Sequence, residues 1–341
     1  MWNFKRLNTF DEELWLEHLN NAEVSHVFFH PILIKVWLDT YKPIRNIEPI
    51  YVEATSDDGN TALMPLVLWK RNWKNAFIHL IVPIGYSDFD YHDPIFKRRP
   101  LDDELSSYWD GLIGFLKQYN ADEIVFDGIR TEMTDNIQQW QKIEISPNLD
   151  ISNMKDGDDL LSFFSSNLRK NTQRRIRRLN EKGNMQFKIF ESADEVPPKI
   201  WNHFMSVHSN KWPNAYKAPG FHNNLLRNCS PNGPIHFSTL LLEDTPISWH
   251  LGFEFKGVFY YYMSTGNTDY AIYSPAKIHL YYMILRAIHK KFRLYDHLRG
   301  DETYKSGMSN GCTYVNTLIV TNSSLGSLLK HYVLKLRKII K

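Results

Sequence analysis

The segment YDHLRGDETYKSGM, from Tyr295 to Met308, gathers ionisable side chains around a single glycine. A carboxylate whose pKa is raised by burial can act as a general base, a phenol can donate a proton, and a lysine or arginine can hold an oxyanion, a carboxylate or a phosphate. The residues that offer these groups are Arg299, Asp301, Glu302, Tyr304 and Lys305. The alternative is a network of charges that only holds a surface turn, and the sequence leaves both interpretations open.

A histidine in the stretch ISWHLGFEF is a second candidate for proton transfer. The stretch is the middle one of three consecutive runs whose separating turns, at residues 244–246 and 256–257, are typical of an antiparallel meander. His250 can take up a proton near neutral pH, because histidine titrates there. If the ring faces a cleft, it can act as a general base; a core histidine satisfied by a neighbouring strand is the alternative.

The dipeptide Ser274-Pro275 predicts the start of a helix, with the serine as N-cap and the proline as the first helical residue. The amides of Ala276 and Lys277 are then expected to be free, and the helix dipole favours an anion at this end. Lys277 adds a positive charge there. A phosphate group is the ligand that such a helix start favours, although many helices begin with Ser-Pro for structural reasons alone.

A strongly basic segment runs from Arg169 to Lys182 and carries seven lysines and arginines against one acid, Glu181. It is predicted to be a helix that docks through one stripe, which consists of Leu168, Thr172, Ile176 and Leu179. The local excess of charge favours an anionic ligand, for which Arg174 and Arg178 are the candidate contacts. A solvated helix face is the usual alternative. Interleaved aromatic residues are absent, which argues against stacking on single-stranded nucleic acid.

Three acids beside two tyrosines occur in the stretch YSDFDYHDP of the first half. Asp88 and Asp93 are predicted to bind a substrate ammonium or sugar hydroxyl groups at the interface between two domains. A capped turn is the competing interpretation.

The order of predicted elements divides the chain into two halves. Helices are expected at Phe10–Leu19, Pro31–Tyr41 and Leu105–Tyr119, with a hairpin around Asp57–Asn60. Periodicity is lost between Ile145 and Asp159, so the boundary is placed between residues 152 and 153. After residue 185 the expected order is strand, two helices, three strands, helix, strand, short helix and strand, followed by an amphipathic basic helix at 327–341.

Composition narrows the class of protein. The formal net charge of +2 gives no global attraction to nucleic acid or to a membrane. Two distant cysteines argue against a disulfide scaffold or a zinc site and suit a reducing cytoplasm. The first residues lack the continuous apolar segment of a signal peptide, and no run reaches the roughly 18–20 apolar residues that cross a bilayer. We therefore expect a cytoplasmic protein without stable membrane insertion, with peripheral binding at the inner membrane face as an option.

The segments quoted above resemble a known family. YSPAKIHLYYMILRAIHKKFRLYDHLRGDETYK is similar to the GNAT acyltransferases of polysaccharide and cellulose biosynthesis clusters, which carry a Ser-Pro-Gly helix start and an Asp-Phe-Leu-Arg-Gly-Asp-Glu-x-Tyr-Lys segment. Ala276 stands where the family usually has glycine. SNLRKNTQRRIRRLNEKG resembles the family's basic helix, and PIGYSDFDYHDPI resembles its Ser-Asp-Tyr-x-Asp-Pro segment. The resemblance covers most of the chain and is strongest from Asn167 to Lys305. This family in turn resembles the Fem aminoacyl transferases.

The resemblance implies an α+β fold of tandem GNAT-like (Fem-like) halves, residues 1–152 and 153–341, each a mostly antiparallel mixed sheet flanked by helices. It implies an acyl-CoA donor, most simply acetyl-CoA, and no metal. The residues expected to contact this cofactor are Met263, Thr265, Ser274, Pro275, Ala276 and Lys277. In the transfer, Tyr304 would protonate the leaving thiolate, and Lys305, which matches the lysine of a Phe-Lys pair in Fem relatives, would hold the oxyanion or a phosphate.

The reaction that this resemblance implies is N-acylation of an amino sugar, or of another amine, for surface polysaccharide. The acceptor would be a small molecule or a sugar nucleotide, and the basic helix from Arg169 to Lys182 could serve a carrier protein or tRNA. Two other functions remain open at this point: a Fem-like transferase that uses aminoacyl-tRNA, and a GNAT-fold module that binds without catalysing.

Overall fold

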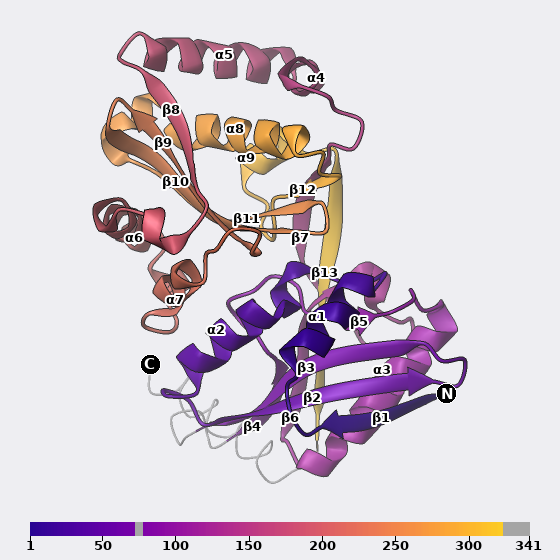
Figure 1. Cartoon of the computed structure of the whole chain (residues 1–341). Coiled ribbons are helices and arrows are strands. Elements are labelled where there is room, and N and C mark those ends of the chain that lie inside the picture. Colours follow the sequence, from indigo (N-terminus) through magenta and orange to yellow (C-terminus); the bar gives the residue numbers. More distant parts are fainter. Residues whose placement is uncertain (72–77, 323–341) are drawn as a thin grey trace, which may run out of the picture. The chain divides into compact units, whose positions relative to one another are not determined.

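The computed structural model describes residues 1–71 and 78–322 and divides the chain into two compact units (Figure 1). Unit 1 consists of residues 1–143 together with those from 314 onward, and unit 2 consists of residues 144–313. The boundary expected between residues 152 and 153 stays a prediction; the compact units divide the chain nine residues earlier and return its C-terminal part to unit 1. The helix expected at 327–341 lies outside the described residues.

Unit 1 is built on a mixed sheet with the strand order β1-β2-β3-β4-β6-β13. Neighbouring strands are antiparallel except for β4 and β6, which are parallel, and a short strand β5 pairs with β3. The strands are β1 (Trp2–Leu7), β2 (Ile47–Ser56), β3 (Thr61–Lys70), β4 (His79–Pro83), β5 (Ile95–Phe96), β6 (Glu123–Arg130) and β13 (Gly311–Thr321).

Helices cover both faces of the unit 1 sheet. They are α1 (Glu12–Asn21), α2 (Pro31–Tyr41) and α3 (Asp102–Leu116). Trp15 of α1 contacts Tyr51 with ring centroids 6.1 Å apart, and Tyr108 of α3 contacts Phe4 at 5.5 Å. Phe4 pairs with Ala54, three residues from Tyr51 in β2. Because successive strand residues alternate between faces, α1 and α3 lie on opposite sides.

Unit 2 repeats this plan with the strand order β7-β12-β11-β10-β9-β8. Only β11 and β12 are parallel. The strands are β7 (Gln141–Asp150), β8 (Met185–Phe190), β9 (Ile235–Leu242), β10 (Thr245–Phe255), β11 (Val258–Gly266) and β12 (Leu294–Asp296). Each unit thus has four antiparallel strands, a helical crossover and a strand parallel to the fourth, which is the tandem GNAT-like, Fem-like fold expected from the sequence.

Six helices belong to unit 2: α4 (Gly157–Phe163), α5 (Ser166–Asn180), α6 (Pro198–Lys211), α7 (Phe221–Arg227), α8 (Pro275–His289) and α9 (Thr303–Ser306). In Figure 1, α8 lies along one side of β9–β11 and α6 along the other. His203 of α6 contacts Trp249 of β10 at 4.7 Å, whereas His279 of α8 contacts the next residue, His250, at 6.4 Å. The alternation along β10 therefore directs His250 toward α8.

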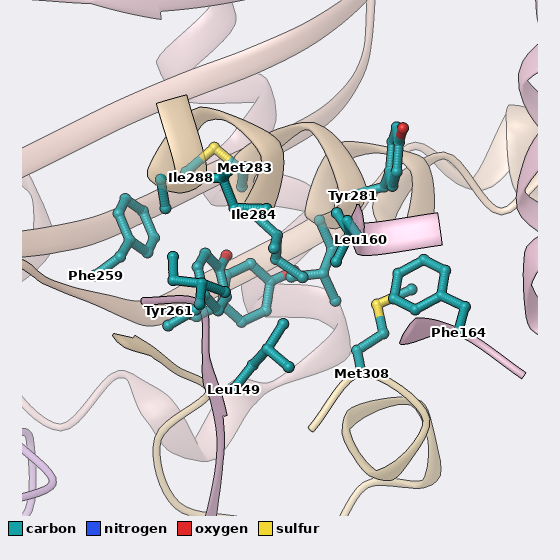
Figure 2. Close-up of a cluster of buried hydrophobic side chains, with 14 residues drawn as sticks. Leu149, Leu160, Phe164, Phe259, Tyr261, Tyr281, Met283, Ile284, Ile288 and Met308 are labelled. Carbon is teal, nitrogen blue, oxygen red and sulfur yellow. The ribbon is translucent and has the colours of Figure 1, made fainter. Parts of the chain in front are cut away.

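The core of unit 2 forms between α8 and the sheet (Figure 2). Its buried members include Phe259 and Tyr261 of β11, Met283 and Ile284 of α8, and Met308. Burying a large apolar side chain contributes roughly 1.5–3 kcal/mol. This cluster therefore holds α8 against β11, and it holds the segment after β12 through Met308.

The element order expected after residue 185 is confirmed, and the helix expected at Pro31–Tyr41 has the predicted bounds. Three strands were not predicted, one of which is the two-residue strand β5. The sequence analysis assigned no element to Trp2–Leu7, which forms β1, and it assigned residues 145–150 to an irregular boundary, whereas they belong to β7. Pro147 and the neighbouring polar residues concealed β7, which pairs with β12 at Asn148, Leu149 and Asp150.

Candidate functional site

The parallel strands β11 and β12 separate at the centre of unit 2. They pair only at Val258–Leu294, Phe259–Tyr295 and Tyr260–Asp296, and β12 then ends while β11 continues to Gly266. A bulge in β11 accompanies this separation, because three residue steps on β11 oppose two on β10. The second half of β11 therefore leaves the side of β12.

The N-terminus of α8 lies beside the end of β11. Pro275 is the first helical residue, as predicted, but the Ser274 side chain makes no capping hydrogen bond and its backbone is left-handed, with φ of 52°. The amide of Lys277 is not free, because it donates to the Ser274 carbonyl at 3.0 Å. A Cβ on Gly266 would stand 3.3 Å from the amide nitrogen of Ala276. The glycine thus keeps side-chain atoms away from this amide.

The corresponding helix start in unit 1 offers no such site. The first turn of α3 carries three acids, and the Glu104 carboxylate accepts the amide of Leu101 at 2.7 Å. Negative charge at this end satisfies the helix itself and repels a phosphate. Of these two crossover helices, only α8 begins without an acidic residue in its first turn.

The basic helix α5 lies next to the start of α8. Thr172 and Leu179 of its stripe are buried, as predicted, while Arg174 and Arg178 are exposed. The guanidinium of Arg178 lies over the ring of Tyr273, 5.3 Å from its centroid. Tyr273 immediately precedes Ser274, so α5 and the exposed Lys277 bring positive charge to the N-terminus of α8.

Met263 and Thr265, the predicted cofactor contacts on β11, are both buried. A directional hydrogen-bond chain holds the second of them. Ser248 donates to the Thr265 carbonyl at 2.9 Å, so it accepts from His279 Nδ1 at 3.1 Å. Burial lowers the pKa of His279 to about 3, which leaves Nε2 as the acceptor for Ser238 at 3.0 Å. The chain joins β9, β10 and α8 to the end of β11.

The segment after β12 is a tightly bonded loop. Asp296 accepts the Leu298 amide at 2.8 Å and the Ser146 hydroxyl at 3.2 Å. Leu298 and Gly300 have φ of +59° and +116°. A Cβ on Gly300 would overlap a carboxylate oxygen of Glu302, which can move away, so it is the backbone conformation that favours glycine at this position.

Lys305 lies inside this loop and does not point toward an acceptor. Its side chain is 4% exposed, and its ammonium donates to the carbonyls of Leu298 at 3.1 Å and Arg299 at 2.6 Å and pairs with Glu302 at 2.8 Å. Two of these contacts are hydrogen bonds, and the third is an ion pair. In this structure the lysine supports the loop, and its predicted role in holding an oxyanion stays a prediction.

Three other side chains meet at the separation of the strands. Burial raises the pKa of Tyr304 and of Tyr261 far above the usual phenol value, and Glu302 adds to both effects as a nearby negative charge. Both phenols therefore stay protonated, as a proton donor must. The Glu302 side chain is 41% exposed. Tyr261 was missed by the sequence analysis; its only signal was its position in the strand VFYYYMSTGN.

His250 lies in the core, which fits the alternative of a core histidine, and its role as a base stays a prediction. The ring is 1% exposed and stacks on Tyr261 with centroids 4.5 Å apart. Neither ring nitrogen has a hydrogen-bond partner among the described residues. Burial, with His279 nearby, lowers the pKa of His250 well below its usual value, so it is neutral at pH 7.

The acids predicted to bind substrate in unit 1 have structural partners instead. Asp93 is fully buried, and it accepts the backbone amide of Arg130 at 2.7 Å and pairs with its Nε at 2.5 Å. Asp88 accepts from Trp37 at 3.0 Å and Tyr41 at 2.7 Å. These partners belong to α2 and β6, so both carboxylates tie their segment to neighbouring elements, and their role in binding substrate stays a prediction. In unit 2, Asp301 is exposed and Arg299 half-buried beside Glu302.

Comparisons with known proteins agree with this geometry. The family model described as acetyltransferase (GNAT) domain matches residues 166–306, which is less than half of the chain. FemX is 12% identical with a TM-score of 0.60, over 93% of this chain and 97% of that one. A conserved protein of unknown function from Bacteroides thetaiotaomicron is 11% identical with a TM-score of 0.60, over 93% and 100%.

The C-terminal domain (DUF2156) of a putative lysylphosphatidylglycerol synthetase from Agrobacterium fabrum is 11% identical with a TM-score of 0.54, over 93% and 94%. At these identities the likenesses show the fold alone. The comparison with curated proteins found no match. The fold is that of tandem GNAT-like proteins, and residues 166–306 of unit 2 are similar to the GNAT acetyltransferase domain.

Neither a membrane-spanning helix nor a metal-binding cluster is found where the chain is described. No helix in residues 1–71 and 78–322 is long and apolar enough to span a bilayer. Within those ranges no group of three His, Cys, Asp or Glu residues is arranged to hold a metal ion.

Proposed function

We propose that this protein is an acyl-CoA-dependent N-acyltransferase, with acetyl-CoA as the simplest donor and an amino sugar or another amine of surface polysaccharide as the acceptor. The observation that carries the proposal is the separation of β11 from β12 directly beside the N-terminus of α8. A thioester can lie along β11 there, with its phosphates at the helix start. The residues suited to hold those phosphates are Ala276, through its amide, Lys277 and Arg178.

The side chains at the separation suit acyl transfer. The acceptor nitrogen bonds to the acyl carbon as the carbon–sulfur bond breaks, so one proton leaves the amine and one reaches the thiolate. We assign the first proton to Glu302, which is partly exposed, and the second to Tyr304, which burial keeps protonated. Tyr261 lies next to both residues and would shield the reacting atoms from water.

Replacing Ala276 with glutamate should abolish CoA binding, because a carboxylate at the first turn of α8 repels the phosphates and fills the space opposite Gly266. Isothermal titration calorimetry with CoA measures the effect. The matched control is Ala215→Glu, which adds the same charge at an exposed position of unit 2. If Ala276→Glu binds CoA as tightly as the parent protein does, the donor site is not at the start of α8.

A Fem-like transferase that uses aminoacyl-tRNA is the second candidate function. The basic helix α5 favours it, because exposed arginines beside the donor site suit a polyanion as well as a pyrophosphate. Single-turnover transfer from acetyl-CoA and from aminoacyl-tRNA, with glucosamine as acceptor, separates the two donors. Binding of CoA without any transfer would favour the non-catalytic module.

Changing Arg174 and Arg178 together to glutamine should weaken binding of the acyl donor while leaving the fold intact. Exposed charges contribute only about 0–1 kcal/mol to stability, so the melting temperature should stay within a few degrees. The apparent donor constant should rise and lose part of its dependence on salt. Assays at low and high salt test this, with Lys199→Gln on the exposed surface of α6 as the control. An unchanged salt profile would make α5 a solvated face.

A further inference from the structure

Unit 1 contains a pocket that the proposed function does not use. It has a volume of about 620 Å³ and lies between α1, the end of β1, and the strands β2 and β3. Every residue that lines it belongs to unit 1. Its lining combines charged side chains of both signs with an apolar wall, which is unusual for a purely structural gap.

A preformed hydrogen-bond acceptor lies in this pocket. Burial lowers the pKa of His18, which keeps the ring neutral at pH 7. The backbone carbonyl of Ile95 near the His18 ring raises this pKa to a smaller extent, and it favours the neutral form in which the proton faces that carbonyl and Nε2 carries none. Nε2 is buried and has no hydrogen-bond partner among the described residues. A ligand in the pocket can satisfy it with a hydroxyl or ammonium proton.

Of four charged residues that line the pocket, two have partners within the protein and two have no ion-pair partner among the described residues. Asp11 accepts the amides of Glu13 and Leu14 at the start of α1, and Glu53 pairs with Lys5 at 3.1 Å. By contrast, the carboxylate of Glu17 and the ammonium of Lys97 have no ion-pair partner in the part of the chain that the structure describes.

The remaining wall is apolar. The Trp15 indole is buried and its N–H is already used, because it donates to the Phe29 carbonyl at 2.9 Å. Leu63 is buried beside the pocket, and Leu14, another lining residue, is 63% exposed although it is apolar. An apolar group bound here would cover part of Leu14, which is the usual source of affinity in a small-molecule site.

We propose that this pocket binds a free amino acid, or a closely similar zwitterion, with an apolar side chain. Glu17 and His18 Nε2 accept from the ligand ammonium, Lys97 donates to its carboxylate, and Trp15 with Leu14 covers its side chain. The site is separate from the donor site of unit 2 in that it shares no residue with it. It holds whether or not the chain is an acyltransferase.

Calorimetry on the full-length protein with three matched probes tests the proposal. Leucine carries both charges, leucinamide only the ammonium, and N-acetyl-leucine only the carboxylate. We expect leucine to bind about tenfold or more tightly than either derivative, because each derivative leaves one charged partner unsatisfied. Equal binding of all three, or no heat with leucine up to about 10 mM, overturns the proposal.

Three variants locate the binding. Lys97→Gln should remove the preference of leucine over leucinamide, and Glu17→Gln should remove its preference over N-acetyl-leucine. His18→Leu should weaken leucine and leucinamide, which carry the ammonium; should it fail to fold, the two exposed variants still decide. Lys199→Gln in unit 2 is the control, and retained CoA binding in every variant shows that unit 2 is intact. If both Lys97→Gln and Glu17→Gln keep the parent's preference for leucine over the two derivatives, leucine binds at another site.

Discussion

Replacing Lys305 with alanine should lower the stability of unit 2 and slow its reaction together. The substitution leaves the carbonyls of Leu298 and Arg299 without their donor inside the protein. Unsatisfied buried acceptors cost about 1–3 kcal/mol each, whereas Glu302 is partly exposed and can turn to water. A loss of about 3 kcal/mol corresponds to roughly 6–12 °C in melting temperature for a domain of this size.

The reaction should slow because the same loop carries the proposed proton-transfer groups. A displacement of about 1 Å at Glu302 and Tyr304 can cost on the order of 10²-fold in rate. The measurements are a thermal melt and single-turnover acyl transfer. The exposed Lys199→Ala is the control for loss of a lysine. A melt within about 2 °C of the parent, with a slow reaction, would instead restore a catalytic role to Lys305.

Tyr304→Phe separates catalysis from support of the loop. The phenylalanine keeps the buried ring and removes only the proton donor. We expect the rate to fall by roughly 10²-fold or more while the melt stays close to the parent. Parental rates in Tyr304→Phe would exclude this phenol as the acid that protonates the thiolate.

Local patterns in the sequence predicted the elements well because their causes are local. Pro31 at the first turn and an apolar face define α2, and the turns at 244–246 and 256–257 define the meander. The same reasoning failed where the cause was distant. β7 is a strand because β12, more than 140 residues later, pairs with it despite Pro147. No local propensity expresses that pairing.

In the candidate site, too, features with a local cause were predicted and features that depend on long-range packing were not. The helix start at Pro275 and the buried stripe of α5 were predicted, because both depend on neighbours within the same helix. The positions of the other site residues depend on long-range packing, which the sequence did not indicate. His250 and Lys305 have the right chemistry for catalysis, but long-range packing places one in the core and the other inside its loop. Tyr261 entered the site only because β11 and β12 separate beyond Tyr260.

Acidification below pH 6.5 should destabilise unit 2 through histidines that are buried in the neutral form. Burial lowers the pKa of His279 to about 3 and of His297 to about 4, and it also lowers the pKa values of His236 and His250 well below their usual value. Below about pH 6.5 the unfolded chain binds protons that the folded chain does not. Each such histidine then removes up to about 1.4 kcal/mol per pH unit, until the pH reaches its folded pKa.

His250→Phe tests this dependence at one position. The phenylalanine keeps the stacking on Tyr261 and removes two ring nitrogens that have no hydrogen-bond partner among the described residues. We expect little change in unfolding free energy at pH 7 and a gain over the parent that grows as the pH falls from 6.5 toward 5. Urea unfolding at pH 7, 6 and 5 measures it, with the exposed His289→Gln as the control, whose curve should parallel the parent. If the His250→Phe curve also runs parallel to the parent, His250 is protonated in the folded protein and its place in a sealed core is wrong.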